Sequence, residues 1–386
     1  MAAKSRKRRR LSLSSRLNLA LYHATIGVVA RLRPPRGPVP PLKPGGRVLV
    51  FSSAGIGDSL LDSVAFRALD GTFPGIHIEA VAHHRRPDVS RHNPFIKELH
   101  LLRKGPVAFV RLLRALKANG PWDAVLFLSC HDPEARSLGY LLARDATVGW
   151  GWKTEMSFLC ATNIDSPEAR DAHLSRQALL VTEAVGARTD YPRMVYEVSP
   201  ADRAALDRRL DELSLPRAPQ VIFQLGGGGA AYRDWPVGHF VELARSLHAA
   251  GIGPIFILGG PDHRAKADTF TAMAAGIPHH DVIGRLPLAL SAALIERSAC
   301  LVSTDTGIMH LGFALGTPTV ALLHCQLGRA RVGPLADLER HEVIELVRPP
   351  GYRSPSDARM EGISPEVVFA AVLRRLARTD GPHAGP

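Results

Sequence analysis

Short apolar runs alternate along most of this chain with amphipathic stretches of helical length. The runs that predict β-strands lie at residues 47–51, 76–81, 124–128, 221–225, 254–258, near 282–283 and from 301 onward. The stretches that predict helices lie at residues 59–69, 107–118, 199–213, 237–249 and 289–298. Strands that alternate with helices in this way are typical of parallel sheets covered by helices. The pattern therefore predicts an α/β protein.

The length of the chain indicates more than one domain. A chain of 386 residues is too long for one ordinary core and suits two domains of about 150–200 residues each. The strand and helix pattern restarts after a Pro-containing break at residues 216–219. The segments that we expect are a basic, partly apolar N-terminal tail with a Pro-rich linker (1–46), a first domain (47–200), an interdomain linker (201–218), a second domain (219–360), and a C-terminal helix with a disordered end (361–386).

The net charge of +12 belongs to the N-terminus rather than to the body of the chain. Residues 1–57 hold twelve Lys and Arg and no Asp or Glu, and the basic and acidic residues that follow cancel. A basic run, Lys4–Arg10, precedes the mostly apolar stretch Leu17–Ala30, which as a helix would span about 21 Å. That length is too short to cross a bilayer but suits a helix that lies in its surface. We therefore expect the tail to dock on an anionic membrane surface.

Two other interpretations of the tail stay open. It could be a solvated segment without fixed structure, or an export signal, although no small-residue cleavage pattern follows Ala30. Nucleic acid is disfavoured as a partner, because no aromatic residues are interleaved with the basic run.

The cysteines indicate a reducing compartment. They stand apart in the sequence, without the spacing of a zinc site or of a disulfide-rich secreted domain. The four are Cys130, Cys160, Cys300 and Cys325. We therefore expect a cytoplasmic protein, peripheral on the inner face of the cytoplasmic membrane, with neither a metal site nor a cofactor.

The segment Leu301–Leu323 carries the clearest chemistry. It predicts a strand, a polar turn at Thr304–Gly307, a helix with His310 in its first turn, and a second strand. The unpaired N–H groups and positive dipole end of a helix N-terminus attract anions, and phosphate is the ligand that we expect. Thr304 or Asp305 is expected to cap the helix. The alternative is a capped helix whose histidine is merely packed.

A second polar turn follows the first predicted strand, where Gly55-x-Gly57 precedes Asp58. The two glycines, with Glu79 about twenty residues further on, suggest a dinucleotide-binding motif. Leu60 argues against that motif, because it stands where the helix needs a small residue to approach the strand. The turn presents the Asp58 carboxylate at a strand's carboxyl end, either as a functional group or as an N-cap, and the two roles are compatible.

A glycine-rich loop follows the strand predicted at 221–225. Four successive glycines, Gly226–Gly229, allow backbone N–H groups to approach a ligand, and Arg233 can bind a phosphate through two hydrogen bonds. A flexible surface loop is the alternative. Because the three turns follow strand carboxyl ends, where open α/β sheets bind ligands, we expect them to form one site.

Together these segments resemble glycosyltransferase family nine, the ADP-heptose:lipopolysaccharide heptosyltransferases. The turn before Asp58, the Arg233–Pro236 element and the segment Val302–Leu322 have the order and spacing of that family, and the similarity runs over roughly residues 47–375. The Asp305-Thr306-Gly307-x-x-His310 element is its specific part. The resemblance implies a GT-B architecture, in which two Rossmann-like, doubly wound domains face a central cleft.

The resemblance also implies an activity and a set of site residues. The activity is an inverting, metal-independent transfer of a heptose or similar sugar from an ADP-activated donor to a lipopolysaccharide core or related lipid-linked saccharide. Asp58, as general base, and Arg233 would be the catalytic residues. The donor-binding residues would be Gly57, Gly228, Gly229, Asp262, Asp305, Thr306, Gly307 and His310.

Two departures from the family pattern leave alternatives open. Ser52, Ser53, Asp62 and Ser63 occupy a region where the family has Arg or Lys and then Pro, and Leu323–Gly328 replaces a Gly-Pro-Thr turn. The chain could therefore be a sibling that uses another nucleotide sugar, such as a UDP-sugar, or a catalytically silent sugar-nucleotide-binding protein. A dinucleotide oxidoreductase, disfavoured above, is the remaining alternative.

Overall fold

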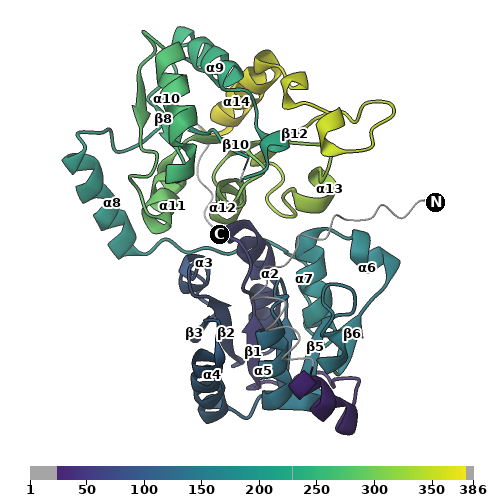
Figure 1. The fold of residues 1–386 in the computed structure, drawn as a ribbon. Coiled ribbons are helices and arrows are strands. Elements are labelled where there is room, and N and C mark those ends of the chain that lie inside the picture. Colours follow the sequence, from purple (N-terminus) through teal and green to yellow (C-terminus); the bar gives the residue numbers. More distant parts are fainter. Residues whose placement is uncertain (1–23, 228, 380–386) are drawn as a thin grey trace.

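The computed structural model describes residues 24–227 and 229–379, which form two parallel six-stranded sheets with their helices, one above the other in Figure 1. The strands of the first sheet are β1 (Arg47–Phe51), β2 (His77–His83), β3 (Glu98–Leu102), β4 (Ala124–Phe127), β5 (Thr147–Trp150) and β6 (Thr162–Ile164). The strands of the second sheet are β7 (Val221–Gln224), β8 (Ile255–Leu258), β9 (His279–Asp281), β10 (Cys300–Thr304), β11 (Thr319–Leu323) and β12 (His341–Glu345).

The helices occupy the connections between these strands, except for the last one, which follows β12. Those of the N-terminal half (residues 24–199) are α2 (Ile56–Thr72), α3 (Asp88–Arg91), α4 (Pro106–Asn119), α5 (Pro133–Ala143), α6 (Pro167–Asp171) and α7 (Leu174–Glu183). Those of the C-terminal half (residues 200–379) are α8 (Pro200–Glu212), α9 (Val237–Ala249), α10 (Arg264–Met273), α11 (Leu288–Arg297), α12 (Gly307–Leu315), α13 (Arg329–Val332) and α14 (Pro365–Thr379).

Both sheets have the strand order of the Rossmann fold. The first runs β3-β2-β1-β4-β5-β6, and the second, counted from β7, repeats it as β9-β8-β7-β10-β11-β12. In such a sheet the order reverses between the first and fourth strands, and ligands bind at the carboxyl ends beside that point. Asp58 follows β1, and Asp305 follows β10. The topology therefore places both turns at the two positions where a ligand crevice is expected.

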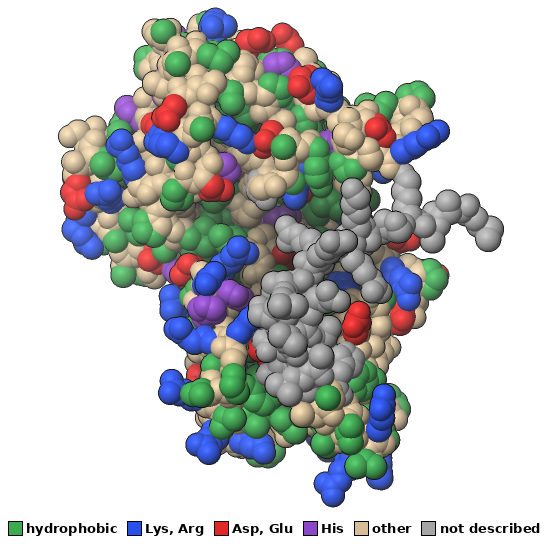
Figure 2. Space-filling view, in the orientation of Figure 1, with side chains coloured by type: hydrophobic (Ala, Val, Ile, Leu, Met, Phe, Trp, Pro, Cys, Tyr) green, Lys and Arg blue, Asp and Glu red, His purple; other side chains and the backbone are tan. Residues whose placement is uncertain are grey.

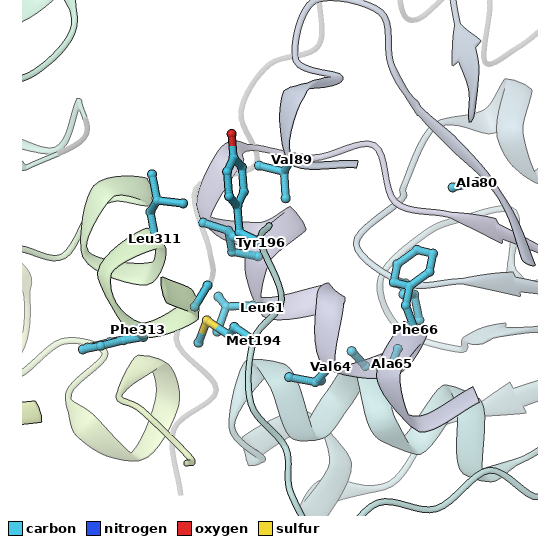
Figure 3. Close-up of a cluster of buried hydrophobic side chains, with 14 of the residues drawn as sticks. Leu61, Val64, Ala65, Phe66, Ala80, Val89, Met194, Tyr196, Leu311 and Phe313 are labelled. Carbon is cyan, nitrogen blue, oxygen red and sulfur yellow. The ribbon is translucent and has the colours of Figure 1, made fainter. Parts of the chain in front are cut away.

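The hydrophobic core lies on both faces of each sheet and continues between the halves. Alternate residues of β1 point to opposite faces, so Val48 and Leu49 belong to different clusters of buried side chains. The larger cluster joins Leu61 of α2 to Leu311 and Phe313 of α12, as Figure 3 shows. Apolar packing between these two helices therefore fixes how the two halves meet.

The structure agrees with the predicted elements where the hydrophobic signal was continuous and adds strands where it was not. The run 124–128 is the fourth strand rather than the third, because β3 precedes it with the polar residues Glu98 and His100. The sequence also gave no prediction for β5, β6 or β12, which are short or partly exposed. The expected domain boundaries stay predictions.

The N-terminal segment is partly described. Residues 24–32 are helical, so this part of the predicted tail helix is present, and residues 1–23 lie outside the described part of the chain. The Pro-rich linker lies on the N-terminal half, where the Val39 N–H donates to Thr162 Oγ1 at 3.0 Å and the Leu42 N–H donates to the Val185 carbonyl at 2.9 Å. Among the described residues, we find no helix whose length and hydropathy would let it cross a membrane.

Candidate active site at the junction of the two halves

The N-termini of α2 and α12 approach each other closely between the two sheets. A Cβ atom on Gly307 would lie 2.8 Å from Ile56 Cγ2, and a Cβ on Gly57 would lie 3.0 Å from His310 Cδ2. Because these positions carry no side chain, the first turns of the two helices can pack together. The turn before Asp58 and the turn before His310 therefore lie next to each other at the junction of the two halves.

Asp58 is the third residue of α2 and not its N-cap. Gly55 is the N-cap, and its N–H donates to Asp58 Oδ2 at 3.1 Å, so the carboxylate closes the first turn from within the helix. One carboxylate oxygen is thereby held in place. This hydrogen bond fixes the orientation of the Asp58 carboxylate at the end of β1.

The C-terminal half contributes a buried carboxylate with two nitrogen-bearing neighbours. Arg233 Nη1 donates to Asp305 Oδ2 at 2.8 Å and to the Asp305 carbonyl at 3.3 Å, while His310 Nε2 lies 3.9 Å from Asp305 Oδ1. Burial lowers the pKa of His310, although the carboxylates of Asp305 and Asp58 act in the opposite direction. The imidazole is therefore neutral at pH 7, and one of its nitrogens is available as a hydrogen-bond donor.

Helix α12 is capped by Thr306, not by the expected Thr304 or Asp305. The Thr306 hydroxyl oxygen accepts a hydrogen bond from the Met309 N–H at 3.4 Å. Thr304 instead donates its hydroxyl to the Gly226 carbonyl at 2.7 Å. The Asp305 carboxylate is paired with Arg233. Contacts with residues outside the segment Leu301–Leu323 therefore decide which residue caps α12.

The glycine-rich loop after β7 accommodates side chains. A Cβ on Gly226 would lie 2.2 Å from His263 Nε2, and the Gly227 N–H donates to Asp234 Oδ1 at 2.5 Å. Gly229 has a φ of +82° and is exposed, and Gly228 lies outside the described residues. The first two glycines therefore make room for neighbouring side chains, which the sequence had not indicated.

Two cavities meet at this junction. The first, which we call the cleft cavity, has a volume of about 660 Å³ and lies between the turns of both halves. Its lining includes Gly57, Asp58, Arg233, Asp262, Asp305, Thr306, Gly307 and His310. These are the predicted site residues apart from Gly228 and Gly229, so the fold brings together a set that the sequence spreads over some 250 positions.

The second cavity, which we call the N-half cavity, has a volume of about 800 Å³. Trp150 lines it from the end of β5, and Trp152 and Lys153 line it from the loop that follows. Arg331 of α13 lines it from the other half. Asp58 lines both cavities. Asp58 therefore lies where the two cavities adjoin.

Burial changes the ionisation of several groups in the N-half cavity. It raises the pKa of Asp62 to about 6, against hydrogen bonds from Ser52 and Ser129 that lower it. It also lowers the pKa of Lys153 to about 8 and that of His131 to about 4. At pH 7 the Asp62 carboxylate is therefore mostly ionised, Lys153 is an ammonium and the His131 imidazole is neutral.

A cluster of potential metal ligands lies near the amino ends of β2 and β3, away from the cleft cavity. Within the described ranges, Glu79, Glu98 and His100 form the only group of three such side chains whose ligand atoms all lie within 4.8 Å of one another. Glu79 is buried near the amino end of β2, where Arg47, His77, His100 and Asn119 donate hydrogen bonds to it. Its position at the edge away from the cleft agrees with rejecting it as a ribose-binding acid.

Sequence reasoning missed several residues of the two cavities. Arg86 and His263 line the cleft cavity, and both follow strands at their carboxyl ends, which is the signal that could have identified them. Trp150 and Lys153 were missed because β5 is a four-residue strand that contains a glycine and was not predicted. Because that strand was not predicted, nothing in the sequence indicated that the following loop lies near Asp58.

Comparison with known proteins gives the family. The chain matches the model of glycosyltransferase family 9 (heptosyltransferase) over residues 110–341. It is 26% identical to lipopolysaccharide heptosyltransferase 1 of Pseudomonas aeruginosa over 292 residues, which cover 72% of this chain and 78% of that protein. It is 23% identical to lipopolysaccharide heptosyltransferase 2 of Escherichia coli K12, over 72% of this chain and 82% of that one. The chain therefore belongs to glycosyltransferase family 9, the heptosyltransferase family.

Solved structures show the same fold. A family 9 glycosyltransferase of Veillonella parvula has a TM-score of 0.75 at 21% identity, over 87% of this chain and 99% of that one. The Escherichia coli ADP-heptose lipopolysaccharide heptosyltransferase II has a TM-score of 0.71 at 19% identity, over 87% of this chain and all of that one. The predicted α/β, GT-B fold and the predicted class, a glycosyltransferase enzyme, are thereby confirmed.

Proposed function

We propose that this enzyme transfers a heptose from an ADP-activated donor to a lipopolysaccharide core or a related glycolipid, with inversion and without a metal ion. The observation that carries the proposal is the position of Asp58, which lines both cavities. A base that serves a glycosyl transfer has to reach the acceptor hydroxyl while the donor sugar lies against it. Asp58 meets this requirement if donor and acceptor occupy the cleft cavity and the N-half cavity respectively.

In the proposed reaction, the acceptor oxygen attacks the anomeric carbon of the donor sugar. The new carbon–oxygen bond forms as the bond to the diphosphate breaks, and the bonding electrons leave with the nucleoside diphosphate. Asp58 accepts the proton of the acceptor hydroxyl. A single displacement from the face opposite the leaving group inverts the anomeric configuration.

Negative charge grows on the leaving diphosphate, and the C-terminal half presents groups that suit it. Arg233 and His310 line the cleft cavity, and the N-terminus of α12 adds backbone N–H groups and the positive end of its dipole. The Asp305 carboxylate holds Arg233 in position through the 2.8 Å hydrogen bond. Donors fixed before the reaction stabilise a developing anion because they need no reorganisation.

The residues of the cleft cavity support a transfer without a metal ion. The stabilising charge would come instead from Arg233 and the helix terminus. Activity in the presence of a chelator tests this part of the proposal.

The donor's nucleoside is the finer part of the proposal. Leu286, Leu288 and Ser291 line the cleft cavity together with Asp262 and suit a base and a ribose, which need an apolar surface and a few polar groups. Leu327, from the segment that departs from the family pattern, lines both cavities. A change there can alter which sugar is accepted, so a sibling activity with a UDP-sugar is a defined alternative outcome.

The test is a transfer assay with the purified full-length protein. Reactions with ADP-heptose, with a UDP-hexose and without a donor are compared, each with and without EDTA. The acceptor is heptose-deficient lipopolysaccharide, and the mass of the product is measured by mass spectrometry. We expect one heptose to be added from ADP-heptose alone, unaffected by EDTA, with the inverted anomer by NMR. Transfer only from a UDP-sugar, retention of configuration, or loss of activity with EDTA would each contradict the corresponding part.

We also propose that the N-terminal segment holds the enzyme on the inner face of the cytoplasmic membrane. Ala30 is buried beside Tyr140, whose hydroxyl donates to the Arg33 carbonyl at 2.7 Å, so the helix over residues 24–32 is attached to the N-terminal half. Leu32 on the same helix is 79% exposed. Hydrophobic side chains lie among Lys and Arg at this lower end of the molecule, as Figure 2 shows. Apolar and basic groups side by side favour an anionic membrane surface.

A further inference from the structure

The cleft cavity offers few cations to a diphosphate. Among the described residues that line it, Arg86 and Arg233 are the only Lys or Arg. The carboxylates of Asp58, Asp262 and Asp305 line it as well. A nucleoside diphosphate carries more than one negative charge at pH 7, because its terminal phosphate alone is largely doubly ionised. The placement of the two guanidinium groups therefore decides how much positive charge the leaving group meets.

The charge of Arg233 is offset within the C-terminal half. Its Nη1 donates to Asp305 Oδ2 at 2.8 Å, and the Asp305 carboxylate is buried. A close pair of opposite charges acts on a third charge mainly as a dipole, so Arg233 offers directed hydrogen bonds more than net charge. His310 adds none, because burial lowers its pKa and the imidazole is neutral at pH 7. The leaving diphosphate therefore needs a further cation.

Arg86 provides a cation without such a counter-ion. Within residues 24–227 and 229–379, no carboxylate oxygen lies within 4.0 Å of its guanidinium nitrogens. Arg86 lies in the loop between β2 and α3, where its N–H donates to the His83 carbonyl at 2.9 Å and the buried Pro87 follows it. The backbone of Arg86 is therefore fixed, while its side chain stays exposed to the cavity.

The Arg86 guanidinium lies beside the N-terminus of α2. A Cβ atom on Gly55 would lie 3.7 Å from Arg86 Nη1, and a Cβ on Gly57 would lie 3.0 Å from His310 Cδ2. These two glycines belong to the same turn, which also carries the positive end of the α2 dipole. An anion bound at this turn can therefore meet Arg86 from one half of the protein and His310 from the other.

From this arrangement we infer that Arg86 binds the diphosphate of the donor from the N-terminal half and stabilises the charge that develops on it during transfer. The inference rests on the proposed function and adds a second guanidinium to its site. Arg86 lines the cleft cavity and not the N-half cavity, so it faces the donor rather than the acceptor. Because Arg86 and Arg233 belong to different halves, a diphosphate that both contact also links the halves.

The experiment compares four full-length proteins: the wild type, Arg86→Met, Arg86→Lys and Arg85→Met. The control Arg85→Met removes the same charge from the preceding exposed residue, which lines neither the cleft cavity nor the N-half cavity. Calorimetry measures the binding of ADP and adenosine, and of UDP and uridine. The transfer assay with heptose-deficient lipopolysaccharide gives kcat and the KM of donor and acceptor.

We expect Arg86→Met to weaken ADP binding at least tenfold and to change adenosine binding less than twofold, because the guanidinium meets only phosphate. Turnover at saturating substrates should fall by about 10²-fold, the usual effect of removing one group that stabilises a developing anion. The acceptor KM should stay unchanged. Arg86→Lys should recover part of the ADP affinity, because it keeps the charge but loses the planar fork that binds two phosphate oxygens.

Three results would overturn the inference. Equal losses of ADP and adenosine binding would make Arg86 a structural residue, and a rise confined to the acceptor KM would place it on the acceptor side. If Arg86→Met behaves like Arg85→Met, the charge at position 86 has no role in the site. Calorimetry keeps these results separate from the proposed function. If the wild type transfers no heptose but Arg86→Met selectively loses ADP, or UDP relative to uridine, the proposed activity fails and the role of Arg86 stands.

Discussion

Replacing Asp58 by Asn separates its catalytic role from its structural one. In the wild type, the Gly55 N–H donates to Asp58 Oδ2 at 3.1 Å. The Asn side chain keeps an oxygen that can accept this hydrogen bond, but it cannot take a proton from the acceptor hydroxyl. We expect turnover to fall by about 10²–10⁴, the usual contribution of general base catalysis. The Kd for ADP should change less than threefold, because Arg233, His310 and α12 are untouched.

The structure sets the magnitude of the side effects. Asp58→Ala also removes the hydrogen bond inside the first turn of α2, which costs about 1 kcal/mol of stability. Asp58→Asn should keep that stability and also lower the pKa of Asp62 from about 6, because the Asp58 charge helps to raise it. Asp70→Asn is the matched control, since Asp70 is an exposed aspartate of the same helix.

The assay is the release of ADP and the mass of the glycosylated acceptor under saturating substrates, with urea unfolding for stability. A variant Asp58→Asn that keeps more than a third of the wild-type turnover, while Asp70→Asn is unchanged, would refute the assignment of the base. A fall in turnover that tracks a loss of folded protein would show that the carboxylate is needed for the helix instead.

The remaining predictions concern the diphosphate, the tail and pH. Arg233→Ala and His310→Ala should each weaken ADP binding at least tenfold more than adenosine binding by calorimetry, because both groups face phosphate in the proposed site; equal losses would point to folding defects. Deletion of residues 1–23 should reduce sedimentation with anionic vesicles at low salt and leave transfer to a soluble, de-O-acylated acceptor oligosaccharide unchanged. If the truncated protein still binds the vesicles, another part of the protein makes the membrane contact. The free energy of unfolding should fall as the pH drops from 6.5 to 4, because burial lowers the pKa of three histidines to about 4 and unfolding lets them take up protons; Asp62, with its raised pKa, offsets part of this. Urea midpoints that stay flat over this range would contradict the prediction. The three histidines are His131, His173 and His341.

The sequence was sufficient to predict those elements whose structure depends mainly on neighbouring residues. The apolar runs of β1, β7, β8 and β10 are continuous and lie in the middle of their sheets, so hydrophobicity alone identified them. The turns that follow them carry Gly, Asp and Thr, whose conformational freedom and capping ability also depend on near neighbours. For this reason the fold class, the family and those residues of the cleft cavity that belong to these turns could be predicted from the chain.

Only the tertiary structure decided which groups act together. Thr304 did not become the helix cap, because its hydroxyl donates to the Gly226 carbonyl in the loop after β7. Asp305 is held by Arg233, 72 positions away in the sequence. Lys153 lines the same cavity as Asp58 because the short strands β5 and β6 bring the loop between them to that place. Contacts between distant segments depend on how sheets and helices pack, and no local pattern of residue types records that packing.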